Sequence, residues 1–197
     1  MKWGEWFRRV LMFTIVSMAL CGYADSGSSN STLPRIGPAP AFTFTLTTQE
    51  GTQLSLLELR GNPVVVTFIF TSCRSACPML TSKLVAIQRR ISKTVKPSVR
   101  FVAISVAPEI DTPNVLKAYA KAHGADLRSW TFLTGTSSAI EDVARRYAVF
   151  QKKRAPDDIE HTFLTSLIDA KGVLRVQYQG VEFNEEEFIA DLHALVP

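Results

Sequence analysis

Two cysteines four residues apart, Cys73 and Cys77, are the residues of this chain best suited to chemistry. The apolar run 68–70 precedes them, and Pro78, directly after the second cysteine, is a residue type that often opens a helix. A thiol at a helix N-terminus has a lowered pKa, because the helix dipole favours the thiolate that binds metals and exchanges disulfides. We therefore expect both thiols to have lowered pKa values. The spacing indicates dithiol chemistry but does not by itself choose between metal binding and electron transfer.

The separation of the two cysteines limits how the loop between them can fold. Fully extended, five residues place their end Cα atoms roughly 13 Å apart, whereas one helical turn brings them to about 6 Å. The shorter distance suits a disulfide, whose Cα atoms lie about 4.4–6.8 Å apart, and it also suits two thiolates on one metal ion. These two states exclude each other. A permanent, inert disulfide is the structural alternative, although so small a loop is poorly placed to stabilise a core.

The segments around the cysteines alternate between strands and helices three times and end in a hairpin and a helix. Such alternation predicts right-handed crossovers and a parallel sheet core, to which the hairpin adds an antiparallel edge. With a dithiol at the end of the first core strand, this order predicts an α/β, thioredoxin-like fold with a mixed central sheet, helices on both faces and an added hairpin. We expect strands at 42–46 (an edge strand), 63–70, 99–106, 130–133, 162–168 and 173–178, and helices opening near Pro78, Thr112, Thr136 and Asn184.

The first 40 residues differ in composition from the rest of the chain. Three basic residues precede the uncharged run 10–20, and small residues follow it, as in a secretory signal. We predict that residues 1–24 are a signal peptide or a retained N-terminal anchor, so that the protein is exported, periplasmic or periplasm-facing. Cleavage after Ala24 would remove Cys21, whereas acylation of Cys21 would give a lipid anchor. Residues 25–40, rich in Ser, Gly and Pro, predict a flexible tether, and 41–197 a single domain.

The charge of the chain argues against nucleic-acid binding. The formal net charge is +4, and the first 24 residues contribute three basic residues and one acidic residue, which leaves +2 on the remainder. The basic residues concentrate in one region that acidic residues follow closely, which indicates a solvated loop; docking onto an acidic protein partner is the functional alternative. The region comprises Arg145, Arg146, Lys152, Lys153 and Arg154, followed by Asp157, Asp158 and Glu160.

Three stretches, FIFTSCRSACPML (68–80), VAPEIDTPNVLKAYAKAHG (106–124) and HTFLTSLIDAKG (161–172), together resemble the Sco-type (Sco/SenC) copper-handling family. The resemblance extends from about Pro40 to the C-terminus. It implies a thioredoxin-like fold and one copper ion, Cu(I) or Cu(II), held by Cys73, Cys77 and His161. Two thiolates and an imidazole are ligands that suit Cu(I). The implied task is assembly of the dinuclear copper centre of cytochrome c oxidase, with an oxidase subunit or another copper chaperone as the partner that receives copper.

A second function remains open, because some members of that family act mainly as thiol–disulfide reductants. In a thiol–disulfide oxidoreductase Cys73 would attack, Cys77 would resolve the mixed disulfide, and His161 would tune the thiol pKa. A peroxiredoxin-like peroxidase is a weaker third reading, because Thr71 and Arg74 are not a persuasive peroxidatic environment.

The remaining candidates for a functional role have structural explanations. His123 beside Gly124 is expected to end a helix, and His193 lies on the predicted terminal helix. We expect Met79 to pack in the core and Asp111 to cap the helix that opens at Thr112. The chain also departs from the family pattern at Ala107 and Glu160, where many members carry aspartate.

Overall fold

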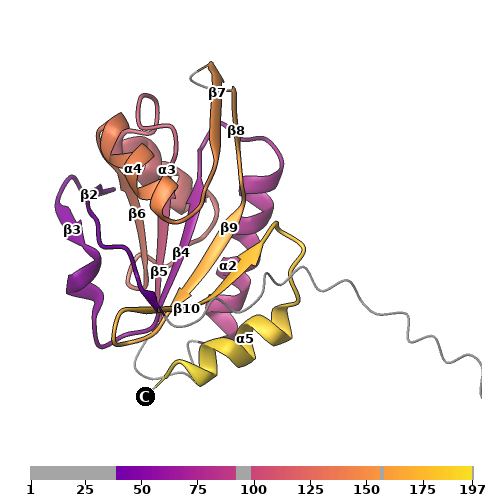
Figure 1. Cartoon of the computed structure of the whole chain (residues 1–197). Helices are drawn as coiled ribbons and strands as arrows, with labels where there is room; N and C mark the ends of the chain where they lie inside the picture. Colours follow the sequence, from indigo (N-terminus) through magenta and orange to yellow (C-terminus); the bar gives the residue numbers. More distant parts are fainter. Residues whose placement is uncertain (1–38, 92–98, 156–157, 197) are drawn as a thin grey trace, which may run out of the picture.

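The computed structural model describes residues 39–91, 99–155 and 158–196. An eight-stranded mixed sheet forms its centre, in the order β1-β10-β9-β4-β5-β6-β2-β3, and β7 pairs with β8 in a separate two-stranded sheet. Helices cover both faces of the main sheet (Figure 1). The elements are β1 (Ala39–Pro40), β2 (Thr45–Thr48), β3 (Gln53–Ser55), the 3₁₀ helix η1 (Leu56–Leu59), β4 (Val64–Ile69), α2 (Ala76–Ile91), β5 (Arg100–Ser105), α3 (Pro113–Ala122), β6 (Trp130–Thr134), α4 (Ser137–Arg146), β7 (Gln151–Ala155), β8 (Asp158–His161), β9 (Leu164–Ile168), β10 (Val173–Gln179) and α5 (Glu185–Ala194).

The centre of the sheet is the part that the sequence predicted best. All six residues of β4 are buried, and β4 pairs in parallel with β5, which pairs in parallel with β6. A strand covered on both faces needs apolar side chains on both, which explains the run 64–69; its one polar residue, Thr67, is buried and accepts a hydrogen bond from the hydroxyl of Thr165. The hairpin of β9 and β10 is antiparallel, and β9 joins the other side of β4. The predicted mixed, thioredoxin-like sheet is confirmed.

Each helix is positioned by a short sequence signal and by one apolar face. Residues 80, 84, 87 and 91 of α2 are all buried, as their helical spacing predicted. Thr112, Thr136 and Asn184 accept hydrogen bonds from the first turns of α3, α4 and α5, so the predicted N-caps are confirmed. The hydroxyls of Thr81 and Tyr119 bond at 3.0 Å, which places α2 and α3 on one face of the sheet, while α4 covers the other face (Figure 1).

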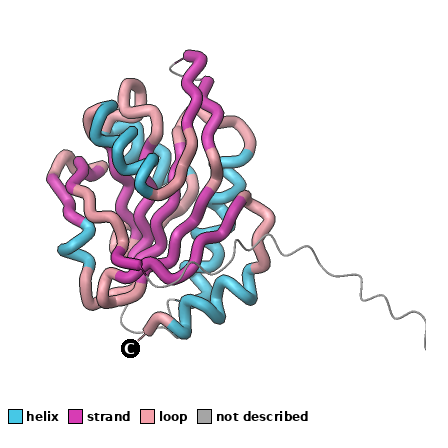
Figure 2. Tube along the Cα trace, in the orientation of Figure 1, coloured by secondary structure: helices cyan, strands magenta, loops and turns pink. Residues whose placement is uncertain are grey.

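Two predicted segments differ from the structure. The strand predicted at 42–46 is β2 at Thr45–Thr48; it is not at the edge, because β3 pairs with it on its outer side. In the charged region predicted as a solvated loop, Arg145 and Arg146 end α4, and residues 152–154, 158 and 160 lie on the β7–β8 ribbon, which extends beyond the main sheet (Figure 2). Charged side chains on a two-stranded ribbon give no apolar alternation, so the sequence carried no strand signal there.

The N-terminal predictions lie mostly outside the described residues. The predicted leader, 1–24, and residues 25–38 of the predicted tether belong to the part that is not described. Ala39 and Pro40, expected to end the tether, pair with β10 as the edge strand β1. Among the helices of the described ranges, none has the length and apolar character needed to cross a membrane.

Candidate dithiol and metal site

The cysteine loop, residues 70–75, follows β4 and leads directly into α2, whose first turn contains Cys77. The N–H of Cys73 donates to the carbonyl of Phe70 at 3.3 Å, and the N–H of Cys77 donates to Sγ of Cys73 at 3.4 Å. The helix begins at Ala76, two residues before the predicted start at Pro78, so Cys77 lies inside its first turn. Proline fits there because the first four N–H groups of a helix have no intrahelical acceptor. Both cysteines are free thiols.

The two thiols have opposite acidities, which corrects the expectation that both pKa values are lowered. Burial acts to raise the pKa of Cys73, but hydrogen bonds from the backbone N–H groups at the helix N-terminus outweigh it, and the pKa lies below its ordinary value. Burial raises the pKa of Cys77 well above its ordinary value, and Cys77 has no exposed surface. The negative charge of a thiolate is costly where water cannot reach it. At neutral pH Cys73 is therefore the more reactive sulfur, and Cys77 holds its proton.

His161 is the last residue of β8, and the next strand, β9, begins at Leu164, two residues later than the start predicted at 162. Its side chain is buried, at 7% exposure, between two aromatic rings whose centroids lie 5.7 Å (Phe70) and 4.3 Å (Phe163) from the imidazole centroid. Nδ1 lies 3.1 Å from the carbonyl oxygen of Thr162. Because a carbonyl oxygen can only accept, Nδ1 carries the proton of this hydrogen bond, which leaves the lone pair on Nε2 of the neutral ring.

The free nitrogen of His161 faces the buried thiol. Nε2 lies 3.9 Å from Sγ of Cys77, across 84 residues of sequence. Burial lowers the pKa of His161, although the hydrogen bond to Thr162 acts in the opposite direction, so the ring is neutral at neutral pH. A neutral imidazole beside a thiol presents one nitrogen and one sulfur donor to a soft metal ion.

The structure brings the three predicted ligands into one region without forming a complete metal site. Cys77 and His161 lie together, and Cys73 contacts the backbone of Cys77. Within the described ranges, no three His, Cys, Asp or Glu side chains converge closely enough to hold a metal ion. A shared ion therefore requires Sγ of Cys73 to turn toward the other two donors, a movement that its half-exposed loop permits.

An open cavity of about 560 Å³ gives access to the site from the side of Cys73. Residues of the cysteine loop and residues of the β7–β8 ribbon, His161 among them, line it. Its lining includes Arg74, beside the first cysteine, and Glu160, which departs from the family pattern. The lining residues are Phe70, Ser72, Cys73, Arg74, Ser75, Ala76, Ile159, Glu160, His161 and Phe163.

Asp111 has a role that the sequence did not predict. It was expected to cap α3, but the side chain of Thr112 does so. Asp111 is fully buried and accepts hydrogen bonds from the N–H of Thr71 (3.1 Å), the hydroxyl of Thr71 (2.5 Å) and the hydroxyl of Ser105 (2.5 Å). It therefore fixes the chain two residues before Cys73. Its partners lie 40 and 6 residues away, so no local pattern could have revealed them.

The other candidate residues divide into confirmed and wrong predictions. His123 is the C-cap of α3, as predicted, and His193 is exposed on α5. Met79 was predicted to pack in the core, but its side chain is 54% exposed. Residues 80, 84 and 87 lie on the buried face of α2, and Met79 lies outside this face, where its side chain reaches solvent.

The fold and the site define a class of protein: a thioredoxin-like domain with a reduced dithiol whose buried sulfur faces a neutral histidine from a separate ribbon. The SCO1/SenC family model matches residues 37–197, and the chain belongs to this family. The SCO1 protein homolog of Bacillus subtilis is 34% identical over 142 residues, covering 71% of this chain and 73% of that protein. A SCO2-like protein of Rickettsia felis is 34% identical over 135 residues, covering 66% of this chain and 64% of that protein.

Solved structures agree with this assignment. A SCO1/SenC family lipoprotein from Bacillus anthracis has a TM-score of 0.75 and 28% identity, covering 82% of this chain and 99% of that one. Arabidopsis thaliana ScoI, solved with copper bound, has a TM-score of 0.71 and 26% identity, covering 79% and 97%. BsSco, in which a disulfide switch was identified, has a TM-score of 0.71 and 30% identity, covering 80% and 94%; it is described as a member of the Sco family of cytochrome c oxidase assembly proteins.

Proposed function

We propose that this chain is a copper metallochaperone that binds one copper ion, Cu(I) or Cu(II), through Cys73, Cys77 and His161. Its cargo serves the copper centre of cytochrome c oxidase. The observation that carries the proposal is the 3.9 Å approach of Nε2 of His161 to Sγ of Cys77, with the ring tautomer set by Thr162. The copper-bound structure of Arabidopsis thaliana ScoI, a relative in fold and family, supports the choice of metal.

The donor set and its protonation fit copper as cargo. Thiolate and imidazole ligands favour Cu(I) and also accept Cu(II) when a further ligand is added. The pKa of Cys77 is raised by burial, so copper binding must displace its proton, and binding becomes weaker as the pH falls. A structural zinc site requires four protein ligands, whereas the proposed set here has three.

The difference in exposure between the two sulfurs suggests an order for transfer. Cys73 borders the open cavity, whereas Cys77 has no exposed surface. An incoming thiol or imidazole of the receiving protein would displace Cys73 first, while Cys77 and His161 retain the ion. Ligands then exchange one at a time, and copper is never released into water. The receiving partner is an oxidase subunit or another copper chaperone.

Copper titration of the reduced protein tests the ligand set. We expect the variants Cys73→Ser, Cys77→Ser and His161→Ala each to bind copper more weakly than the wild type, as measured by competition with a chelator of known affinity. His123→Ala is the matched control, since that histidine ends α3 away from the cysteine loop. Equal affinity of His161→Ala and the wild type would exclude the three-ligand site.

A thiol–disulfide oxidoreductase is the second candidate, favoured by the opposite acidities of the two thiols. A lowered pKa at half-exposed Cys73 suits an attacking thiolate, and a buried Cys77 suits the resolving position. The disulfide switch identified in BsSco is consistent with such chemistry. This function predicts that Cys77→Ser traps partner proteins in mixed disulfides, and that reduction of the partner is unaffected in His161→Ala.

We infer that residues 1–24 export the domain as a cleaved signal peptide or a retained anchor, and that the following residues form a tether. The inference rests on the charge and apolar pattern of the leader. The domain 41–197 would then face the periplasm, where copper is delivered to the oxidase. Fractionation of cells that express the full chain, with mass measurement of the mature N-terminus, distinguishes cleavage, acylation at Cys21 and retention. Recovery of the uncleaved chain from the cytoplasm would contradict export.

A further inference from the structure

The ribbon that carries His161 needs contacts outside itself to hold its position. β7 and β8 hydrogen-bond to each other and not to the strands of the main sheet. An isolated two-stranded ribbon is at best marginally stable in water. Gln151 is opposite His161 in the register, and Lys153 is opposite Ile159. Because directly paired residues share a face, these four side chains form the inner face of the ribbon.

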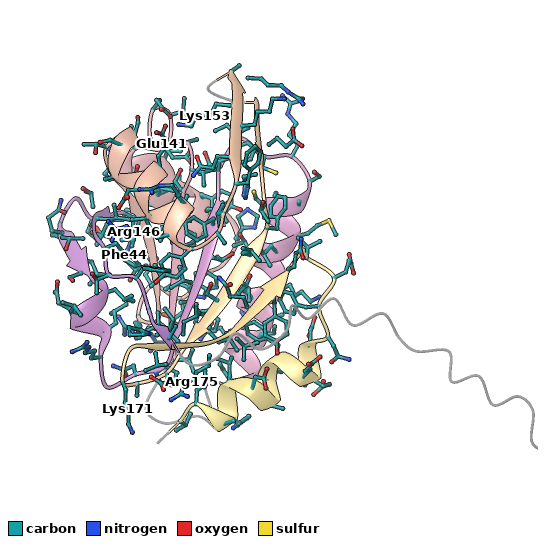
Figure 3. The ribbon with its side chains drawn as sticks, viewed as in Figure 1. Phe44, Glu141, Arg146, Lys153, Lys171 and Arg175 are labelled. Carbon is teal, nitrogen blue, oxygen red and sulfur yellow. The ribbon has the colours of Figure 1, made fainter. Side chains whose placement is uncertain are left out.

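Lys153 joins this inner face to the body of the protein. Its Nζ donates to Oε1 of Glu109 at 2.9 Å, and the hydroxyl of Ser137 donates to the same oxygen at 2.9 Å. The Lys153 side chain is 26% exposed, less than the lysine or arginine of any other ion pair described between side chains of this chain. Figure 3 shows Lys153 on the side of β7 that faces α4, where Ser137 begins that helix.

Glu109 lies in the short loop between β5 and α3, the loop whose Asp111 contacts the chain just before the cysteines. The loop follows β5 and is closed by hydrogen bonds from the N–H groups of Ile110 and Asp111 to the carbonyl of Ala107. Asp111 holds Thr71, two residues before Cys73, as described above. One acidic residue of the loop therefore fixes the cysteine side of the site, and another, two residues earlier, contacts the histidine ribbon.

We propose that the Lys153–Glu109 ion pair is a latch that holds the histidine ribbon against the cysteine loop, and that Glu109 and Lys153 are positioning residues for His161. The proposal rests on the proposed function, in which His161 is a copper ligand. Opening the latch lets the ribbon move away and withdraws the imidazole from the buried sulfur. The latch then sets how fast copper can leave, without touching the metal.

Two measurements test the latch on the full-length mature protein. The first is hydrogen exchange of the β7 and β8 backbone amides in the reduced, copper-free protein, since a marginal ribbon loses its ladder once it leaves the body. The second is the rate at which bound Cu(I) passes to an excess of bathocuproine disulfonate. Loss of a partly exposed ion pair changes the equilibrium between the docked and the displaced ribbon by about two- to fivefold. We expect Glu109→Gln and Lys153→Met each to raise both rates by that factor.

The double variant and a matched ion pair provide the controls. If the two residues act as a pair, the double variant, Glu109→Gln with Lys153→Met, should show hydrogen-exchange and copper-transfer rates no higher than those of either single variant. Glu50→Gln removes an equivalent pair with Lys117, 2.6 Å long, which joins the β2–β3 turn to α3, and it should leave both rates unchanged. In 0.5 M salt the wild-type rates should approach those of the variants, because salt screens the pair.

The outcomes separate the latch from the proposed function. Faster exchange in Glu109→Gln, together with unchanged copper release in both Glu109→Gln and His161→Ala, would support the latch and reject His161 as a ligand. Faster release in His161→Ala, with neither rate altered in Glu109→Gln, would overturn the latch and retain the ligand. An unchanged redox midpoint of the Cys73–Cys77 pair in Glu109→Gln is also expected, and a shifted midpoint would count against a role confined to the ribbon.

Discussion

Replacing Asp111 with alanine removes the acceptor of three hydrogen bonds inside the protein. The N–H and hydroxyl of Thr71 and the hydroxyl of Ser105 would each lose their partner. A buried donor left without an acceptor costs about 1–3 kcal/mol. Because Thr71 is partly exposed and both hydroxyls can rotate, the sum is below the maximum, and we expect about 3–5 kcal/mol of lost stability.

Asparagine at position 111 is the sharper comparison. Its carbonyl oxygen can take the place of Oδ2, which accepts from the Thr71 N–H and the Ser105 hydroxyl. Its amide group then faces the Thr71 hydroxyl, which can turn to accept instead of donate. All three contacts survive without the help of a negative charge, so Asp111→Asn should cost only about 1–2 kcal/mol.

Urea unfolding of the reduced, copper-free protein measures both effects. Asp142→Ala is the control, because that carboxylate lies in exposed pairs with Arg145 and Arg146 on α4 and should change stability by no more than about 0.5 kcal/mol. The reasoning fails if Asp111→Ala is as stable as the control, or if asparagine is as damaging as alanine. The first result would mean that the buried network is not stabilising, and the second that charge matters more than the hydrogen bonds.

Three further predictions concern the thiols, the hairpin and the core. Iodoacetamide should modify Cys73 before Cys77 at pH 7, because the pKa of Cys73 is lowered and that of Cys77 raised; peptide mass analysis showing equal rates would contradict this. The pKa of Asp169 is lowered, since hydrogen bonds from the Val173 N–H and Arg175 outweigh burial. Asp169→Asn should therefore lose stability relative to the wild type above about pH 4, and the difference should shrink as the pH falls further; a difference that is constant from pH 7 to pH 2 in urea unfolding would refute this. Leu84→Ala, at a fully buried position of α2, should cost about 2–5 kcal/mol with an unchanged denaturant slope, and a cost below about 1 kcal/mol would show that the site can collapse.

Local sequence patterns were sufficient to predict two kinds of element: strands that are buried on both faces, and helices that begin at a capping residue. The run 64–69 predicted a central strand because both of its faces are covered, and the caps Thr112 and Thr136 predicted where α3 and α4 begin. The β7–β8 ribbon was missed for the opposite reason. Its strand conformation comes from pairing with a partner and from contacts such as Lys153 with Glu109, which no short sequence window contains.

The sequence by itself determined the candidate donors: two sulfurs at a fixed spacing, one of them at the start of a helix, and an imidazole in a stretch with a recognisable family pattern. The tertiary structure decided their chemical states, because burial and backbone contacts depend on what folds around each group. Proximity to helix N–H groups lowers the pKa of Cys73, and enclosure raises that of Cys77. The carbonyl of Thr162 directs the free nitrogen of His161 toward Cys77. Residue types set which atoms can bind or react, whereas the fold sets which of them carry a proton and which can meet.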